Sequence, residues 1–264
     1  MRVVESGVGN TLPIVLVPGW GCTAWIFHET LVPLAAAGFH AMAVELKGHG
    51  ESDKPALESE YTTGSMRDQL LETLDALGLE QAGIVGHSMG AAIAAHLAVM
   101  APTRVSGLVL AAPVGFSGVR GMWLFRLLTP RFAVPVLRLL ATRRLIRVML
   151  SVVYGSLRRA SNQDVEEFYA QVELPGTIMA LRNLLHEFEW NAPFPRLEVP
   201  YVSIHGSEDV LAPPGDAPGD GAIRALIIDG SGHVLFDEAP EIVNRVIAEF
   251  FAGTGAPYIS SQND

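Results

Sequence analysis

Cysteine is nearly absent from this 264-residue chain, in which Cys22 stands alone. A single cysteine cannot form an intramolecular disulfide, and this favours a reducing compartment. The N-terminal Met-Arg-Val-Val-Glu-Ser-Gly also lacks the apolar run of a secretory signal peptide. We therefore expect a cytoplasmic protein.

Long apolar segments are lacking as well. The longest uncharged stretch with a helical pattern, residues 82–100, is interrupted by glycines and polar residues. It fits the buried core of an α/β domain better than a membrane span. Hydrophobic residues nevertheless make up 49% of the chain, so length and composition predict one large domain with a sizeable core.

Acidic residues are missing from one third of the chain. Residues 81–163 contain no aspartate or glutamate but ten arginines, whereas the remainder holds 8 basic and 28 acidic residues. The formal net charge of −10 argues against binding to nucleic acid, whose phosphate backbone attracts positive proteins. Positive charge is therefore concentrated in one segment.

Short apolar runs alternate with helical patterns along the chain. This order indicates βαβ units and a mostly parallel central sheet flanked by helices. We expect strands at residues 11–17, 41–46, 82–85, 105–112, 201–204 and 225–228, and helices at 25–37, 65–77, 89–100 and 241–251.

The alternation stops between residues 114 and 193, where every pattern is helical. We interpret this segment as a helical cap inserted into a core formed by residues 1–113 and 194–252. The polar, glycine-containing residues 253–264 are expected to form a flexible tail.

One short motif raises the question of chemistry. Residues 86–90 read Gly-His-Ser-Met-Gly, between a predicted strand and a predicted helix. The pattern G-x-S-x-G in a strand–turn–helix context is typical of a nucleophile elbow, in which Ser88 is exposed on a strained turn. Small neighbours at both sides let the backbones pass closely. Ser88 is our candidate nucleophile.

A serine hydroxyl needs a base, and the base needs an orienting carboxylate. His233 follows the predicted strand at residues 225–228, and Asp209 follows the one at 201–204. Because the carboxyl ends of parallel strands carry the chemistry of open α/β sheets, both residues are expected beside Ser88. Asp237 and Glu238 are less favoured as the acid, since Asp209 lies at the expected strand end.

A glycine-framed loop follows the first apolar run, at Gly19-Trp20-Gly21. We expect the backbone N–H groups of Trp20 and Met89 to form an oxyanion hole, with Gly19 lining the substrate pocket. Cys22 lies close to this loop but has no histidine and acid arranged around it. The other histidines lack metal-ligand spacing, so we expect neither a metal nor another cofactor.

Together these motifs resemble the α/β-hydrolase superfamily over nearly all of residues 10–252. The order Ser88, Asp209, His233 matches the nucleophile–acid–base order of that fold. Residues 45–52 (ELKGHGES) resemble its D-x-x-G-x-G-x-S turn, with Glu45 in place of aspartate. The residue before the oxyanion glycine is Pro18 rather than histidine, and residues 211–221 are rich in proline and glycine where relatives often have a helix.

The resemblance implies hydrolysis of a carboxylic ester, thioester or lactone through an acyl-serine intermediate. Superfamily members that open epoxides or remove halides use an aspartate nucleophile, where this chain has Ser88. A C–C bond hydrolase, or a lyase or synthase with the same triad, is an alternative. A non-catalytic ligand-binding protein on the same fold is another.

The positive segment lies in the expected cap. Residues 122–154 are densely apolar and are interrupted by arginines at 126, 131, 138, 143, 144 and 147. These arginines are either solvated or paired with the acidic core, or they form a docking face for an anionic carrier protein, a membrane surface or an acyl-CoA. We expect the apolar side to roof a pocket for a small-molecule acyl ester, through Trp123, Phe125, Leu127 and Leu128.

A shorter likeness concerns residues 18–25 (PGWGCTAW), which resemble the pimeloyl-carrier-protein methyl ester esterases. Those enzymes meet an acidic carrier protein through basic groups of the cap. The likeness therefore makes an acidic carrier one of the expected partners of the arginine-rich segment.

Overall fold

The computed structural model describes residues 1–114, 119, 121–190, 197–214 and 224–253. Seven strands form one sheet in the order β1-β3-β2-β4-β5-β6-β7. Their bounds are Arg2–Ser6 (β1), Leu12–Val17 (β2), Phe39–Glu45 (β3), Ala82–His87 (β4), Val105–Ala111 (β5), Tyr201–Gly206 (β6) and Arg224–Ile228 (β7). All neighbours pair in parallel except β1 and β3. The predicted mostly parallel sheet flanked by helices is confirmed.

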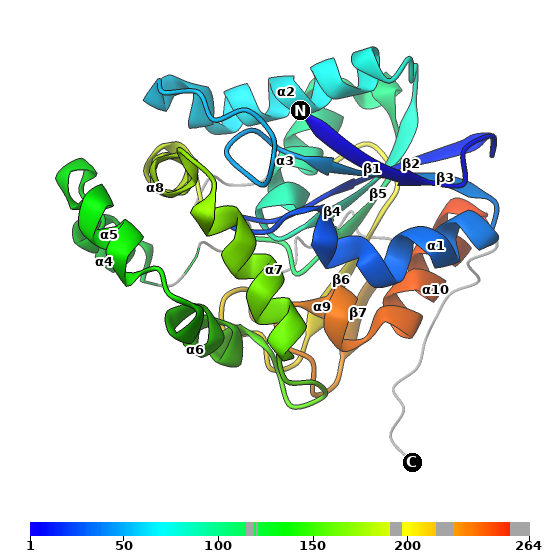
Figure 1. Ribbon diagram of the computed structural model, residues 1–264. Helices are drawn as coiled ribbons and strands as arrows, with labels where there is room; N and C mark the ends of the chain where they lie inside the picture. Colours follow the sequence, from blue (N-terminus) through cyan, green and yellow to red (C-terminus); the bar gives the residue numbers. More distant parts are fainter. Residues whose placement is uncertain (115–118, 120, 191–196, 215–223, 254–264) are drawn as a thin grey trace.

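Helices cover both faces of this sheet (Figure 1). On one face lie α2 (Thr63–Ala76) and α3 (Met89–Met100), and on the other lie α1 (His28–Ala36) and α10 (Pro240–Phe251). Strand β2 explains this arrangement. Val15 and Val17 belong to the hydrophobic core under α2 and α3, whereas Ile14 and Leu16 belong to the core under α1 and α10. Alternation along buried strands thus supplies apolar side chains to two cores at once.

Two local details differ from the sequence prediction. Strand β1 was not expected, because it is a half-exposed edge strand without a long apolar run. The expected helix at residues 25–37 is divided into a 3-10 turn, Ala24–Phe27, and α1. Its start is fixed by Thr23, whose side chain accepts a hydrogen bond from the Trp25 backbone N–H.

In the described part of residues 114–193, every regular element is helical. It contains α4 (Met122–Leu128), α5 (Val134–Leu140), α6 (Arg143–Val153), α7 (Asn162–Glu173) and α8 (Thr177–Glu187), with a 3-10 turn at Arg131–Ala133. In Figure 1, α7 and α8 lie nearer the sheet, and α4, α5 and α6 lie at the outer edge of the molecule. Residues 115–118, 120 and 191–193 of the expected cap and 254–264 of the expected tail are outside the described part.

None of the described helices is both long enough and apolar enough to span a bilayer. The stretch 82–100, which has the composition closest to a span, is divided between β4 and α3.

Candidate active site

Ser88 occupies the turn between β4 and α3 and has an unusual backbone, with φ 54° and ψ −117°. Positive φ is costly for a residue with a side chain, and the surrounding structure has to impose it. The two flanking glycines explain how the turn fits. A Cβ at Gly86 would collide with the backbone of Ala91, and one at Gly90 with the carbonyl oxygen of Val17.

The structure brings Ser88 together with the two other predicted partners. Ser88 Oγ lies 2.9 Å from His233 Nε2, and His233 Nδ1 lies 2.8 Å from Asp209 Oδ2. All three residues are buried. Since an ionised carboxylate only accepts hydrogen bonds, Nδ1 carries the proton and Nε2 is free to accept from the Ser88 hydroxyl.

Asp209 is held by more than the histidine. Its Oδ1 accepts hydrogen bonds from the backbone N–H groups of Leu211 at 2.8 Å and Ala212 at 2.9 Å. Burial by itself raises the pKa of the Asp209 carboxyl. The His233 ring and the two backbone amides together lower the pKa by more than burial raises it, so the pKa of Asp209 lies below its ordinary value. Asp209 is therefore ionised at neutral pH and keeps the imidazole in one tautomer.

The predicted oxyanion loop approaches the nucleophile closely. A Cβ at Gly19 would lie 2.9 Å from the Cβ of Ser88, so only glycine fits here. The Cys22 backbone N–H donates to the Gly19 carbonyl oxygen at 3.2 Å and closes the turn. Among the described residues, no hydrogen bond occupies the backbone N–H of Trp20 or of Met89. Both donors are thus available to an incoming oxygen.

Two side chains that the sequence analysis missed anchor this loop. Burial lowers the pKa of His49 to about 4, so its ring is neutral, and Nε2 accepts from the Gly21 backbone N–H at 3.1 Å. From α7, Gln171 Nε2 donates to the Gly21 carbonyl oxygen. His49 belongs to the 45–52 turn and has no metal-ligand spacing, and neither property predicts this contact. No local pattern distinguishes Gln171 from other helical glutamines.

The surroundings of Cys22 and His87 determine the protonation state of each side chain. Burial raises the pKa of the Cys22 thiol to about 12, which leaves no thiolate at neutral pH. Burial lowers the pKa of His87 to about 3, and its neutral ring contacts the His233 carbonyl oxygen through Nε2 at 2.9 Å. No group of three or more potential metal ligands is found in the described ranges.

A family model for the alpha/beta hydrolase fold matches residues 13–240. The chain belongs to the α/β-hydrolase family. A pimeloyl-[acyl-carrier protein] methyl ester esterase from Edwardsiella ictaluri (strain 93-146) is 27% identical over 256 residues, which cover 91% of this chain and 93% of that protein. A 2-hydroxymuconate semialdehyde hydrolase from Pseudomonas sp. (strain CF600) is 36% identical over 124 residues, or 45% and 44% of the two chains.

Solved structures agree on the fold. The epoxide hydrolase CorEH superposes with a TM-score of 0.81 over 96% of this chain and 95% of that chain, at 21% identity. Several curated relatives are matched over part of their length, since the aligned segment spans between 30% and 66% of four of them.

The loop that carries His233 is clamped by Glu238. This buried carboxylate accepts hydrogen bonds from the backbone N–H groups of Gly232 at 2.9 Å, Val234 at 3.1 Å and Gly155 at 2.7 Å. The His233 backbone N–H in turn donates to the Val153 carbonyl oxygen at 2.7 Å. Glu238 had been weighed only as an alternative acid; in the structure it positions the loop on both sides of the histidine.

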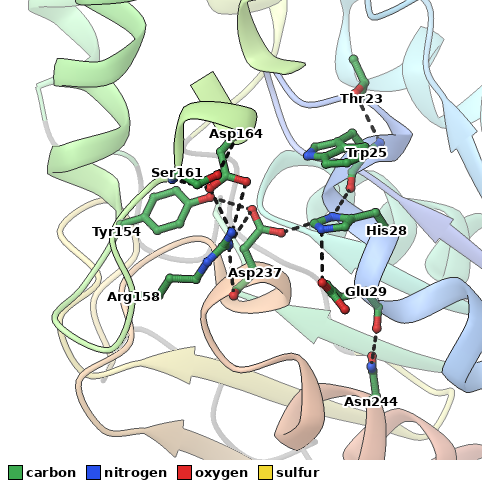
Figure 2. A network of polar contacts seen from close by, with 10 residues as sticks. All are labelled: Thr23, Trp25, His28, Glu29, Tyr154, Arg158, Ser161, Asp164, Asp237 and Asn244. Atoms are coloured by element: carbon green, nitrogen blue, oxygen red, sulfur yellow. Dashed lines mark hydrogen bonds and ion pairs between the residues drawn. The ribbon is translucent and has the colours of Figure 1, made fainter. Parts of the chain in front are cut away.

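Next to this clamp lies a buried polar network around Asp237 (Figure 2). The Tyr154 hydroxyl donates to Asp237 Oδ2 at 2.6 Å, and Arg158 Nη1 lies 3.7 Å from the same oxygen. Arg158 also pairs with Asp164 at 3.0 Å, which belongs to the capping box of α7. His28 approaches Asp237 from the opposite side at 3.7 Å. The network connects the segment before α7 to α9 (Leu235–Glu238), the short helix that follows His233.

The network should give the protein a characteristic dependence of stability on pH. Burial raises the pKa of Asp237 to about 6, whereas the pKa of an aspartate in the unfolded chain is about 4. The folded state therefore binds the Asp237 proton more tightly than the unfolded state does. The contribution of protonated Asp237 to the free energy of unfolding is fully present below pH ~4 and is lost as the pH rises through ~6. We expect the free energy of unfolding of the native chain, relative to Asp237→Asn, to fall by on the order of 2 kcal/mol between pH ~4 and ~7.

Urea unfolding at the two pH values measures this difference. Asp229→Asn is the matched control, because Asp229 is exposed and pairs only with Ser207 among the described residues. An equal difference between the native chain and Asp237→Asn at both pH values would contradict the prediction.

The anchor at Gly21 supports a second prediction. Gln171→Leu removes the donor to the Gly21 carbonyl oxygen and loosens the loop that carries the Trp20 amide. Because loss of a complete oxyanion donor costs about 10²–10³-fold in kcat, we expect a smaller loss of about tenfold, with KM nearly unchanged. Steady-state kinetics on an ester substrate measures both constants.

Gln81→Leu is the control for this variant, since Gln81 Nε2 also donates to a backbone carbonyl, that of Thr103, at 3.1 Å. The control should retain the native kcat. A change in KM alone for Gln171→Leu would assign Gln171 to substrate binding rather than to the oxyanion loop.

The four residues that are predicted to roof the pocket lie on α4. On α4, Met122 is buried and Arg126 turns inward, where its guanidinium donates to the carbonyl oxygens of Leu185 at 3.0 Å and Phe188 at 3.1 Å. Met122 and Arg126 are four residues apart on α4 and therefore lie on the same side of the helix, which faces α8. The opposite side carries the four residues that were expected to roof the pocket, and they are 52–70% exposed: Trp123, Phe125, Leu127 and Leu128.

Proposed function

We propose that this α/β hydrolase is a serine hydrolase that cleaves a carboxylic ester, thioester or lactone with a hydrophobic acyl group. The observation that carries the proposal is the continuous line of hydrogen bonds from Ser88 Oγ through His233 to Asp209, at 2.9 and 2.8 Å. Hydrogen bonds of this length let the imidazole take the hydroxyl proton as the oxygen attacks.

In the first half of the proposed reaction, Ser88 Oγ bonds to the carbonyl carbon and His233 Nε2 takes its proton. The carbonyl oxygen becomes an oxyanion and accepts hydrogen bonds from the Trp20 and Met89 amides. Collapse of this intermediate expels the alcohol, which receives the proton from His233. Asp209 stabilises the imidazolium throughout.

In the second half, water attacks the acyl-Ser88 ester. His233 removes a proton from the water, the same two amides hold the second oxyanion, and Ser88 Oγ leaves with the proton returned by the imidazole. Every proton is handled by these side chains and water, so the proposed reaction invokes no cofactor.

The choice of serine chemistry over epoxide opening rests on the nucleophile. Among its relatives the chain has proteins named epoxide hydrolases, and such enzymes form an ester on a carboxylate. Here the elbow position carries the hydroxyl of Ser88, which is bonded to a base. We therefore do not propose epoxide hydrolysis.

Cleavage of a C–C bond is a second candidate function. It is supported by the relative named 2-hydroxymuconate semialdehyde hydrolase, at 36% identity. The relative named for a carrier-linked methyl ester, with 27% identity over nearly the whole of both chains, instead supports an ester bound to an acidic carrier. We favour the ester because that match covers 91% of the chain rather than 45%.

We further propose that residues 114–193 act as a cap over the site. Three contacts support this role, since each joins a helix of the segment, or the turn after it, to a loop of the site. They are Gln171 with Gly21, the Trp20 indole N–H with the Leu181 carbonyl oxygen at 2.9 Å, and Gly155 with Glu238.

Labelling with a fluorophosphonate tests the activated serine. We expect covalent capture of the native chain, with the modified peptide containing Ser88, and no capture of Ser88→Ala. Hydrolysis of p-nitrophenyl esters of graded chain length, beside an assay with a ring-cleavage product, then separates the ester from the C–C candidate. A folded native chain that is not labelled would favour a non-catalytic ligand-binding protein.

A further inference from the structure

The outer helices α4, α5 and α6 expose an unusual density of apolar side chains. Of the 23 exposed large hydrophobic residues in the described part of the chain, 13 lie between residues 122 and 153. We call them, with Arg138 and Arg144, the basic apolar face. The apolar members are Trp123, Leu124, Phe125, Leu127, Leu128, Phe132, Val136, Leu139, Leu140, Leu145, Val148, Met149 and Val152.

This exposure follows from how the helices are seated. In α6, Leu150 is buried and Ile146 and Val153 are half-buried, so one helical side packs inward against α7. The opposite side presents Val148 and Val152 to solvent. Figure 1 shows α4, α5 and α6 at the rim of the molecule, farther from the sheet than α7 and α8. Exposed apolar side chains at this density on three successive helices mark an interaction site.

The charge of the same face is positive. Arg131 pairs with Glu58 at 3.4 Å and Arg143 with Glu166 at 2.8 Å, so these two arginines are compensated. Arg147 bonds only to the neutral Asn162 among the described residues. Arg138 and Arg144 are exposed and have no ion-pair partner in the described part. No acidic residue occurs between residues 81 and 163 to neutralise them.

We infer that the basic apolar face docks on an anionic lipid bilayer. Short helices with aromatic and leucine side chains beside arginines enter the boundary between headgroups and acyl chains, where both kinds of group are satisfied. A second copy of the chain fits less well, because a two-fold contact would bring the unpaired arginines of both copies together. An acidic soluble protein would pair the arginines but would not by itself cover 13 apolar side chains.

Docking would present the hydrolase to acyl substrates dissolved in the membrane. The inference concerns binding only and does not require Ser88, so it is tested on Ser88→Ala, which cannot hydrolyse the lipid. Failure of the proposed chemistry would leave this test unaffected.

The experiment measures partition of full-length Ser88→Ala onto vesicles of phosphatidylcholine with and without phosphatidylglycerol. We expect binding at least about tenfold tighter to the anionic vesicles, weakening as salt is added. The fluorescence of Trp123 should shift to the blue on binding, because Trp123 is 70% exposed and the other three tryptophans are buried or half-buried.

Two pairs of substitutions separate the apolar and the charged parts. Trp123→Ser with Phe132→Ser should weaken binding to both vesicles by about tenfold or more. Arg138→Gln with Arg144→Gln should weaken binding to anionic vesicles about 25-fold, since each arginine near such a surface contributes about fivefold. Val32→Ser is the control, because Val32 is 67% exposed on α1, outside the face; it should bind like the parent chain.

Equal partition on both vesicles, or none, would overturn the inference. So would a dimer in light scattering that Phe132→Ser dissociates, which would assign the face to a second copy. Binding to an acidic acyl-carrier protein through Arg138 and Arg144, without vesicle binding, would also overturn it. Thermal unfolding of each variant verifies that the chain is folded when binding is lost.

Discussion

Ser88→Ala is expected to lower kcat for ester hydrolysis by about 10⁴-fold or more, to the level that substrate binding and the oxyanion donors sustain alone. The substitution removes the only atom that can form the acyl intermediate. It should leave the fold intact, since the described hydrogen bond of the Ser88 side chain is the one to His233. Thermal unfolding and kcat, measured on the same preparation, test both parts of the prediction.

Ser106→Ala is the matched control, because Ser106 is an exposed serine on the neighbouring strand β5. It should retain native kcat. Residual activity of Ser88→Ala within about tenfold of the native chain would contradict the acyl-serine mechanism and would favour acid–base chemistry by His233 alone.

Asp209→Asn is expected to lower kcat by about 10⁴-fold while the geometry is preserved. The asparagine oxygen can still accept from the Leu211 and Ala212 amides, as Asp209 Oδ1 does. Its NH₂ group then faces His233 Nδ1 and donates to it, which forces the ring proton onto Nε2. In that tautomer the histidine cannot take the Ser88 proton.

Kinetics of Asp209→Asn with an ester of good leaving group measures the effect, and KM should change little. The control is Asp229→Asn, another aspartate that follows a strand of the sheet but is exposed. A loss of less than about tenfold would show that a different carboxylate orients the histidine. Asp237→Asn should not reproduce the loss, since Asp237 faces Tyr154 and Arg158 instead.

Much of the fold and of the candidate site could be predicted from local patterns. The helix at residues 89–100 was predicted with the bounds of α3, because a uniform apolar composition follows an unambiguous turn. The positions of Ser88, Asp209 and His233 were predictable because each follows a strand with an apolar run, and parallel strands end at one edge of the sheet.

Other features depended on contacts between distant segments. The orientation of α4 could not be read from its sequence, in which apolar residues surround the helix on nearly every side. Arg126 decides it by binding the carbonyl oxygens at the end of α8, about sixty positions later in the chain. As a result, side chains expected over the pocket face solvent.

The sequence by itself determined which residues are candidates for the proposed chemistry: a serine in a glycine-framed elbow, and an aspartate and a histidine after later strands. It could do so because strand ends and turns are local properties. Only the tertiary structure decided how that chemistry is held in place. Glu238 clamps the His233 loop and Gln171 anchors the oxyanion loop through hydrogen bonds to backbone groups. Backbone N–H and C=O groups are the same at every position, so no sequence pattern records which side chain will reach them.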